Sequence, residues 1–212
     1  MRRRWFPALL LATVVALNGM PALGRDSTTT IVQAGAGNSV TTDQSRSTGS
    51  IASIEQSGQR NHLDLAQTGN ADRLDAHQLG DHGSSSIVQS GAYDEISLLD
   101  RGRGDHLELA QSGDFGIISL DQTGADNSAM LFQRSDFQHA TVAQNGTGNR
   151  ATVAQNGVGE RADLVQIGSG NISDIAQNGG GNALVHHQYG NGLSLSITQT
   201  GGQSMTITQT GP

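Results

Sequence analysis

The side chains best suited to chemistry in this sequence are seven histidines and a scatter of carboxylates. His62, His106 and His139 recur at one position of an eleven-residue repeat, which would suit a metal site if they met. If each repeat unit is a strand, His62 and His106 lie two layers apart, about 9.6 Å, whereas zinc ligands lie about 2 Å from the ion. The histidines are therefore predicted to be solvated, and no metal site is expected.

Two carboxylates, Asp64 and Glu108, also share a repeat position, as the acid and base of a glycosidase would share a face. They too lie two layers apart, at or beyond the roughly 9.5 Å limit for such a pair. Lysine is absent, which removes phosphate-loop and Schiff-base chemistry. No catalytic or cofactor-binding residue, no cofactor and no enzymatic activity are expected. The adhesion tripeptide Arg103-Gly104-Asp105 is read as a turn, where Gly and Asp are common.

The regular feature of the chain is a glutamine every eleven residues, with Asp100 in the one vacant position. Two intervals differ, twelve residues after Gln44 and ten after Gln199. A fixed period of this kind determines the fold. The repeated glutamines are Gln33, Gln44, Gln56, Gln67, Gln78, Gln89, Gln111, Gln122, Gln133, Gln144, Gln155, Gln166, Gln177, Gln188, Gln199 and Gln209.

Each unit reads as a five- to six-residue strand and a tight turn. Ala151, Val153 and Gln155 alternate with other residues at period two, which is typical of a strand. Two units form a rung of about 22 residues, which predicts an all-β fold: a β-solenoid of about eight rungs with two facing parallel sheets. Turns are predicted at Gly35, Gly58, Gly69, Gly80, Gly91, Gly113, Gly124, Gly146, Gly157, Gly168, Gly179, Gly190 and Gly201.

The repeated glutamines should point inward and stack as amide ladders, as in cross-β structures, because a buried amide without a partner is costly. A second ladder is expected where each new strand starts. Its members would be Asn38, Asn61, Asn127, Asn149, Asn171 and Asn182.

The N-terminus has the pattern of a secretory signal peptide over residues 1–24, with a basic start, an apolar run and a small-residue cleavage site. Residues 25–30 form a short N-terminal segment and 31–212 the repeat solenoid. The twelve arginines less the three at positions 2–4 leave nine against nineteen acidic residues, a net charge of −10. This charge argues against nucleic acid as a partner. No integral membrane segment is expected after processing, and with no cysteine the fold is held without disulfides.

Charge is unevenly distributed along the repeats. Residues 175–212 contain no Asp, Glu, Lys or Arg, whereas residues 94–126 are acidic. We expect the uncharged C-terminal edge to seed polymerisation and the acidic middle to restrain it, unless the asymmetry is drift in a tolerant repeat. The candidate gatekeepers are Asp94, Glu95, Asp100 and Asp105.

The repeated glutamine, glycine and asparagine residues resemble the curlin repeat. The segment from Ser50 to Gln67 carries Gln56, Gly58 and Asn61 at the family's positions, and residues 144–155 fit in the same way. The resemblance implies a subunit of extracellular curli amyloid fibres of biofilms, acting in surface adhesion and forming cross-β amyloid on assembly. It further implies partners among other curlin-type subunits, a nucleator and an outer-membrane secretion pore, and a place on a Gram-negative-type outer surface.

Two other functions stay open at this point. The chain could be a minor curlin nucleator or associated subunit rather than a major subunit. It could also be a monomeric secreted β-solenoid that binds ice, a glycan or a host cell. That second function predicts capped ends and one chemically uniform outer face, and the sequence shows neither.

Overall fold

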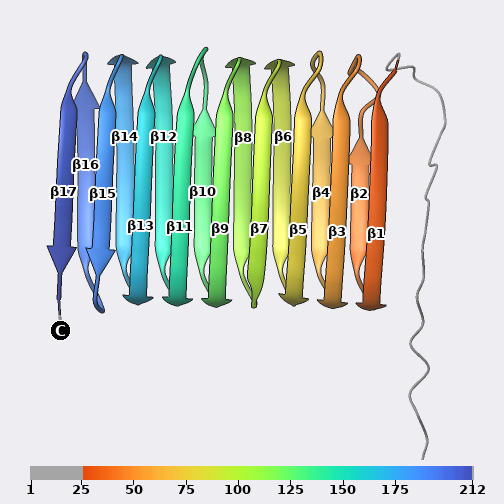
Figure 1. The fold of residues 1–212 in the computed structure, drawn as a ribbon, viewed down its shortest axis with the longest axis horizontal. Coiled ribbons are helices and arrows are strands. Elements are labelled where there is room, and N and C mark those ends of the chain that lie inside the picture. The colour runs from red at the N-terminus through yellow and green to blue at the C-terminus, as the bar shows by residue number, and fades with distance from the viewer. Residues whose placement is uncertain (1–25, 212) are drawn as a thin grey trace, which may run out of the picture.

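The computed structural model describes residues 26–211, which form a single β-solenoid (Figure 1). The expected signal peptide lies outside the described residues. Among residues 26–211 no helix is long and apolar enough to cross a membrane. The strands are β1 Thr28–Ala36, β2 Ser39–Asp43, β3 Ile51–Gln59, β4 His62–Gln67, β5 Arg73–Asp81, β6 Ser84–Ala92, β7 Glu95–Arg103, β8 His106–Asp114, β9 Ile117–Ala125, β10 Ser128–Gln133, β11 His139–Thr147, β12 Arg150–Val158, β13 Arg161–Ser169, β14 Ile172–Gly180, β15 Ala183–Tyr189, β16 Ser194–Thr200 and β17 Ser204–Thr210.

Successive strands alternate between two sheets. The nine odd-numbered strands form sheet A and the eight even-numbered strands form sheet B, each in order along the solenoid axis. Pairing within each sheet is parallel, and the register places Gln144 beside Gln166, 22 residues on. In Figure 1 the arrows of the two sheets point in opposite directions, one layer over the other. The predicted β-solenoid of about eight 22-residue rungs with two facing parallel sheets is confirmed.

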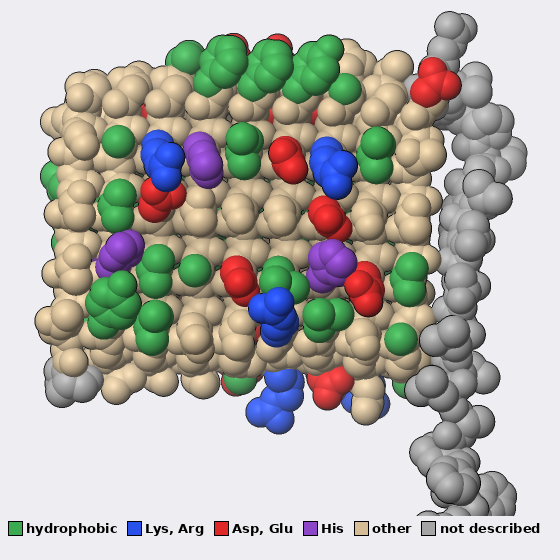
Figure 2. Space-filling model, viewed as in Figure 1, with side chains coloured by type: hydrophobic (Ala, Val, Ile, Leu, Met, Phe, Trp, Pro, Cys, Tyr) green, Lys and Arg blue, Asp and Glu red, His purple; other side chains and the backbone are tan. Residues whose placement is uncertain are grey.

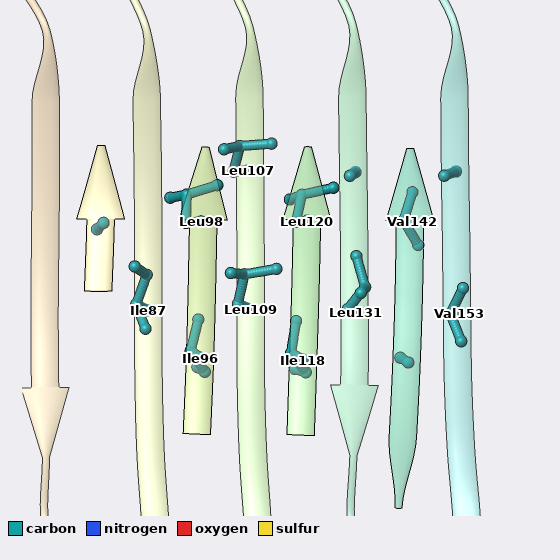
Figure 3. Packing of buried hydrophobic residues seen from close by; sticks show 14 of the residues in the cluster. Ile87, Ile96, Leu98, Leu107, Leu109, Ile118, Leu120, Leu131, Val142 and Val153 are labelled. Carbon is teal, nitrogen blue, oxygen red and sulfur yellow. The ribbon is translucent and has the colours of Figure 1, made fainter. Parts of the chain in front are cut away.

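The core lies between the sheets and is two side chains thick. In β11, Ala140, Val142 and Gln144 are buried while the residues between them are more exposed. This alternation repeats from strand to strand, so each full strand sends aliphatic side chains and one ladder position inward. Figure 3 shows Leu98, Leu109 and Leu131 among the side chains that fill this layer. Burial of these side chains supplies the main driving force for a fold without disulfides.

The predicted turn glycines require a correction. Most strands have nine residues rather than five or six, because parallel pairing continues through the Gln-x-Gly segment. Gly69, Gly190 and Gly201 lie outside strands, but the other glycines remain in the ladder. Those within strands are Gly35, Gly58, Gly80, Gly91, Gly113, Gly124, Gly146, Gly157, Gly168 and Gly179.

Glycine is needed at these positions because neighbouring rungs come very close there. A Cβ atom built on Gly146 would lie 1.8 Å from the carbonyl oxygen of Gly168 in the next rung, and one on Gly157 would lie 1.4 Å from that of Gly179. Gly146 also has φ +134°, which only glycine adopts readily. The glycine therefore bends the strand toward the corner while the rungs stay hydrogen-bonded.

Two residues after this glycine the chain turns through a left-handed residue. We call the turns from sheet A to sheet B the A-to-B corner, and those from sheet B to sheet A the B-to-A corner. Gly148 takes the left-handed position of the A-to-B corner with φ +65°. At the B-to-A corner the same position holds Tyr93, Phe115 and Phe137, with φ of 61°, 60° and 57°.

These three aromatic side chains form a row along one edge of the solenoid. Their rings stack with centroids 5.1 and 5.2 Å apart and interplanar angles of 6° and 2°. Each ring is about half exposed, and Figure 2 shows a row of hydrophobic side chains along one long edge. Stacking and ring burial offset the strain of bulky residues in a left-handed conformation.

Candidate assembly site: the amide ladders and their open ends

Sheet B carries an unbroken ladder of side-chain amides. Each Nε2 donates to the Oε1 of the glutamine one rung further toward the C-terminus, at 2.5–3.2 Å. The interior members of this ladder are fully buried, so the amide contacts take the place of water. The chain of donors runs through Gln44, Gln67, Gln89, Gln111, Gln133, Gln155, Gln177 and Gln199.

Sheet A carries a second ladder with the same direction and one interruption. Gln33, Gln56 and Gln78 are joined by amide hydrogen bonds of 2.7 Å. Asp100 occupies the next position, and the ladder resumes from Gln122. From there the donors run through Gln122, Gln144, Gln166, Gln188 and Gln209.

The glutamines also join the two sheets. In most rungs the second hydrogen of Nε2 is donated to a backbone carbonyl at the start of the facing strand, as from Gln155 to His139 O at 3.1 Å and from Gln166 to Arg150 O at 3.0 Å. In these rungs the amide uses both donors, one along the axis and one across the core. A carboxylate at the same position can do neither, because it only accepts hydrogen bonds.

The asparagines at the strand starts bind the backbone more than one another. Asn149 Oδ1 accepts from the backbone N–H of Asn171 at 3.0 Å, and Asn149 Nδ2 donates to the backbone carbonyl oxygen of Gly168 at 2.9 Å. One side-chain amide pair exists among them, Asn149 Nδ2 to Asn127 Oδ1 at 3.2 Å. Asn38, Asn61 and Asn171 likewise accept from the backbone N–H one rung on, and Asn182 accepts from Gln203 N. These asparagines therefore hydrogen-bond each corner to the same corner of the neighbouring rung.

Several of the same corner positions hold acids instead. Asp72, Asp94, Asp105 and Glu160 are each 1% exposed, and each has one oxygen atom without a hydrogen-bond partner. Burial raises the pKa of Asp72 and of Glu160, and raises that of Asp94 to about 7. No arginine is buried among the described residues, so no cation offsets these carboxyl groups.

The four candidate gatekeepers therefore differ in environment. Asp94, Asp100 and Asp105 are buried, at 1%, 3% and 1% exposure. Glu95 instead points to solvent beside Arg73, with 3.9 Å between Arg73 Nε and Glu95 Oε1. A charge on Glu95 is screened by water, so we assign it no role in restraining assembly.

One histidine overturns the expectation that all seven are solvated. His186 is 0% exposed, and its Nδ1 lies 2.9 Å from Ser173 Oγ across the core. Burial lowers its pKa, which keeps the ring neutral. His187 is more exposed, because successive strand residues face opposite sides. Among residues 26–211 no group of three or more His, Cys, Asp or Glu side chains could hold a metal ion.

The adhesion tripeptide is not available as a surface motif. Arg103 ends β7 and Gly104 has φ +72°, in keeping with the predicted turn. The Asp105 carboxylate is buried and accepts from the Asn127 amide at 2.7 Å. A receptor that reads the acid of the tripeptide would find it inside the solenoid.

The described solenoid ends in strands that are paired on one side only. β1 and β2 form one end, and β16 and β17 the other, so each end exposes strand edges on both sheets. β1 begins at Thr28, inside the segment 25–30 that was expected to precede the repeats. Because each glutamine-to-glutamine hydrogen bond is donated toward the C-terminal end, Gln33 and Gln44 present Oε1 atoms that accept no ladder hydrogen bond. Gln199 and Gln209 present Nε2 atoms with no further glutamine to receive them.

The aromatic row is the feature that sequence reasoning missed. Tyr93, Phe115 and Phe137 each follow a ladder glutamine by four residues, in three consecutive rungs of one sheet. That shared offset was visible in the sequence and could have identified the row. Figure 2 shows charged side chains scattered over the broad face, without a large patch of one sign.

Comparison with known proteins gives one match. Residues 124–157, which run from the end of β9 to the end of β12, match the curlin associated repeat. This stretch includes the ladder residues Gln133, Gln144 and Gln155 and the strand-start Asn127 and Asn149. No curated protein and no solved structure matches the chain.

Proposed function

We propose that this chain is a structural subunit of curli-type extracellular fibres, which grow by the addition of one solenoid to the end of another. The observation that carries the proposal is the pair of amide ladders with one common direction and complementary ends. The Nε2 atoms of Gln199 and Gln209 at one end, which donate there only to backbone carbonyls, match the Oε1 atoms of Gln33 and Gln44 at the other. Gln44 Oε1 accepts from Thr29 Oγ1 at 2.6 Å in the single chain, a bond that docking would exchange. A second copy of the chain, turned by half a turn about the solenoid axis, would therefore continue both ladders head to tail. The half turn is needed because sheet A has nine strands and sheet B eight, so that sheet A of the second copy follows sheet B of the first.

The open strands support the same function. Unpaired parallel strands are templates for another chain, and solenoids that stay monomeric carry polar caps at their ends. The C-terminal end has no charged side chain from residue 175 onward, so docking there requires no desolvation of charge. The curlin associated repeat at residues 124–157 is a further support, since that family builds polymers.

Export to the cell surface belongs to this proposal. The first 24 residues have the pattern of a signal peptide, and a curli-type fibre is assembled outside the cell from exported subunits. Partners would be further copies of the chain and other curlin-type subunits, with a nucleator and an outer-membrane pore. We place the chain as a fibre subunit with a role in biofilm matrix and surface adhesion.

Polymerisation of purified residues 25–212 tests the proposal. We expect a lag, self-seeding, dye fluorescence and a meridional fibre reflection near 4.7–4.8 Å. A folded chain that stays monomeric and dye-negative at every concentration would reject fibre formation and favour the monomeric surface-binding solenoid.

A variant at the C-terminal end makes the test specific. Gln209 is partly exposed in the single chain, and its Oε1 accepts from Gln188 Nε2 at 2.9 Å. Gln209→Glu keeps this acceptor and stays hydrated in the monomer, but it would place a carboxylate inside the fibre. We expect the lag to lengthen severalfold. Because Gln209 Oε1 also lies 3.4 Å from His186 Nε2, monomer stability is compared at pH 7.5, where the ring is neutral and makes the same contact. Thr208→Glu, on the exposed face of the same strand, is the matched control and should polymerise nearly as the parent chain does.

A further inference from the structure

Where Asp100 interrupts the sheet A ladder, a hydrogen atom is missing for the buried side-chain oxygens to be paired. Gln78 Nε2 donates across the core to Ser85 Oγ at 2.7 Å rather than along the axis. Asp100, the next position, has a buried Oδ1 without a hydrogen-bond partner. One rung further, the buried Oε1 of Gln122 also has no partner, whereas Gln122 Nε2 continues the ladder to Gln144.

These two orphan atoms belong to neighbouring positions of one column. Asp100 and Gln122 are paired in the register of β7 and β9, and both side chains are buried, at 3% and 0% exposure. Both atoms are acceptors when the carboxyl group is ionised, so they would repel each other in a site without water. A hydrogen on the Asp100 carboxyl turns the same pair into a donor and an acceptor.

The groups around Asp100 favour this hydrogen. Asp105, at the A-to-B corner that follows β7, is the titratable group that acts on Asp100, and it is itself buried. The charged and titratable side chains of the adjoining strands lie on the outer face. At 38–58% side-chain exposure these are Arg73, Asp75 and His77 of β5, Glu95 and Arg101 of β7, and Asp121 of β9. Asp81 of β5 is half-buried and accepts from Gln59 N. Arg103 of β7 and the β8 residues His106, Glu108 and Asp114 are exposed, and β6 has no titratable side chain. Burial, together with the neighbouring carboxyl group of Asp105, raises the pKa of Asp100 to about 8.

We infer that Asp100 carries a proton in the folded chain and donates it to Gln122 Oε1, so that a neutral carboxylic acid completes ladder A in place of an amide. The proton is taken up from solvent on folding, and its loss leaves an unpaired charge between two sheets. Protonation of Asp100 therefore stabilises the central rungs of the folded chain.

The direction of the pH dependence follows from the two protonation states. In the unfolded chain an aspartate ionises near pH 3.9, whereas in the folded chain Asp100 keeps its proton up to about pH 8. The stabilisation is complete below about pH 4 and is lost progressively as the pH rises toward 8. Between pH 5 and pH 7 this one proton changes the folding equilibrium constant by up to about 100-fold.

This inference concerns folding of the single chain and does not require polymerisation. If the proposed fibre function also holds, protonation of Asp100 makes assembly more favourable in acid, because only the folded solenoid presents ordered ends. A chain that shows the pH response but does not polymerise would support protonation of Asp100 and contradict the fibre function. The two ideas therefore fail separately.

The test compares Asp100→Gln with the parent chain in denaturant unfolding at pH 5 and pH 7, at concentrations that keep the chain monomeric. Gln is the ladder residue of the neighbouring rungs and donates without a titratable proton. We expect the ratio of folding constants between the two pH values to be up to about 100-fold smaller for the variant than for the parent chain. Glu108→Gln makes the same chemical change on the exposed face of the same rung and should match the parent chain.

Parallel pH profiles of the parent chain and Asp100→Gln would overturn the inference. An infrared difference spectrum at pH 7.5 gives an independent reading, because a protonated carboxyl group has its own C=O stretch. That band should be present in the folded parent chain and in Glu108→Gln, and weaker in Asp100→Gln. An unchanged band would also overturn the inference, and Asp100→Asn, closest in shape, serves if the Gln variant does not fold.

Discussion

The close approach of the rungs at the strand glycines gives a sharp prediction for Gly146→Ala. The added Cβ would lie 1.8 Å from Gly168 O, whereas real Cβ contacts essentially never fall below 3.0 Å. The two rungs would have to separate there by the difference, 1.2 Å. Their backbone pairing at this point could not survive such a shift, because a hydrogen bond of about 2.9 Å does not stretch that far.

The cost can be built from its parts. Two lost or weakened backbone hydrogen bonds contribute about 1–3 kcal/mol. The conformation of Gly146, φ +134°, adds about 1–3 kcal/mol for any residue with a side chain. We therefore expect Gly146→Ala to lower the free energy of unfolding by about 2–6 kcal/mol.

Gly148→Ala is the matched control two residues away. Gly148 has φ +65°, and a Cβ built there meets no atom within 4 Å. Only the left-handed conformation is penalised, at about 1–2 kcal/mol. Guanidinium unfolding of both variants, followed by far-ultraviolet circular dichroism, measures the difference. Equal destabilisation by the two substitutions would refute the role of rung contact and leave backbone conformation as the whole effect.

Three further substitutions probe other parts of the solenoid. Gln155→Leu leaves a donor and an acceptor of ladder B unpaired in a dry core, so urea unfolding should show a loss of about 2–4 kcal/mol; a loss below 1 kcal/mol would contradict a stabilising ladder. Phe115→Gly relieves about 1 kcal/mol of left-handed strain but removes two ring contacts, each worth about 0.5–1.5 kcal/mol, and their buried area. Its thermal midpoint should therefore fall slightly, and a rise would mean that the row does not stabilise the fold. Because burial lowers the pKa of His186, the stabilisation from its neutral ring is present above about pH 6.5 and is lost as the pH falls. His186→Leu should therefore lose less stability than the parent chain between pH 7.5 and pH 5. An equal loss in denaturant unfolding would count against this.

The fold was predictable because its determinants recur in register. Each ladder glutamine and the alternating aliphatic residues before it, such as Ala151 and Val153, specify a strand with one buried face. The 22-residue rung then follows from parallel pairing of alternate units. Strand length was underestimated because the glycine of Gln-x-Gly was read as a turn signal, although at Gly146 it serves close contact between hydrogen-bonded strands.

Side-chain partners were harder to predict than side-chain direction. His186 lies inward, where strand alternation allows it, although all seven histidines were expected to be solvated; its pairing with Ser173 depends further on which residues of the two sheets face each other. The same holds for the diversion of Gln78 to Ser85 beside Asp100. Five of the strand-start asparagines share the A-to-B corner, whereas Asn182 lies at the B-to-A corner. Their backbone partners depend on corner geometry that period alone does not specify.

The alternation of units between two sheets restricts how such a gene can lengthen. Insertion of a single eleven-residue unit would move every later strand to the opposite sheet and exchange the two corners, so that the aromatic row and the buried acids would lose their alignment. Insertion of two units preserves every column. The two irregular intervals, after Gln44 and after Gln199, both fall at the B-to-A corner, and in each case the next glutamine returns to its column. Small length changes are thus absorbed at one corner, and growth of the array is expected in pairs of units, each pair adding one rung to the solenoid.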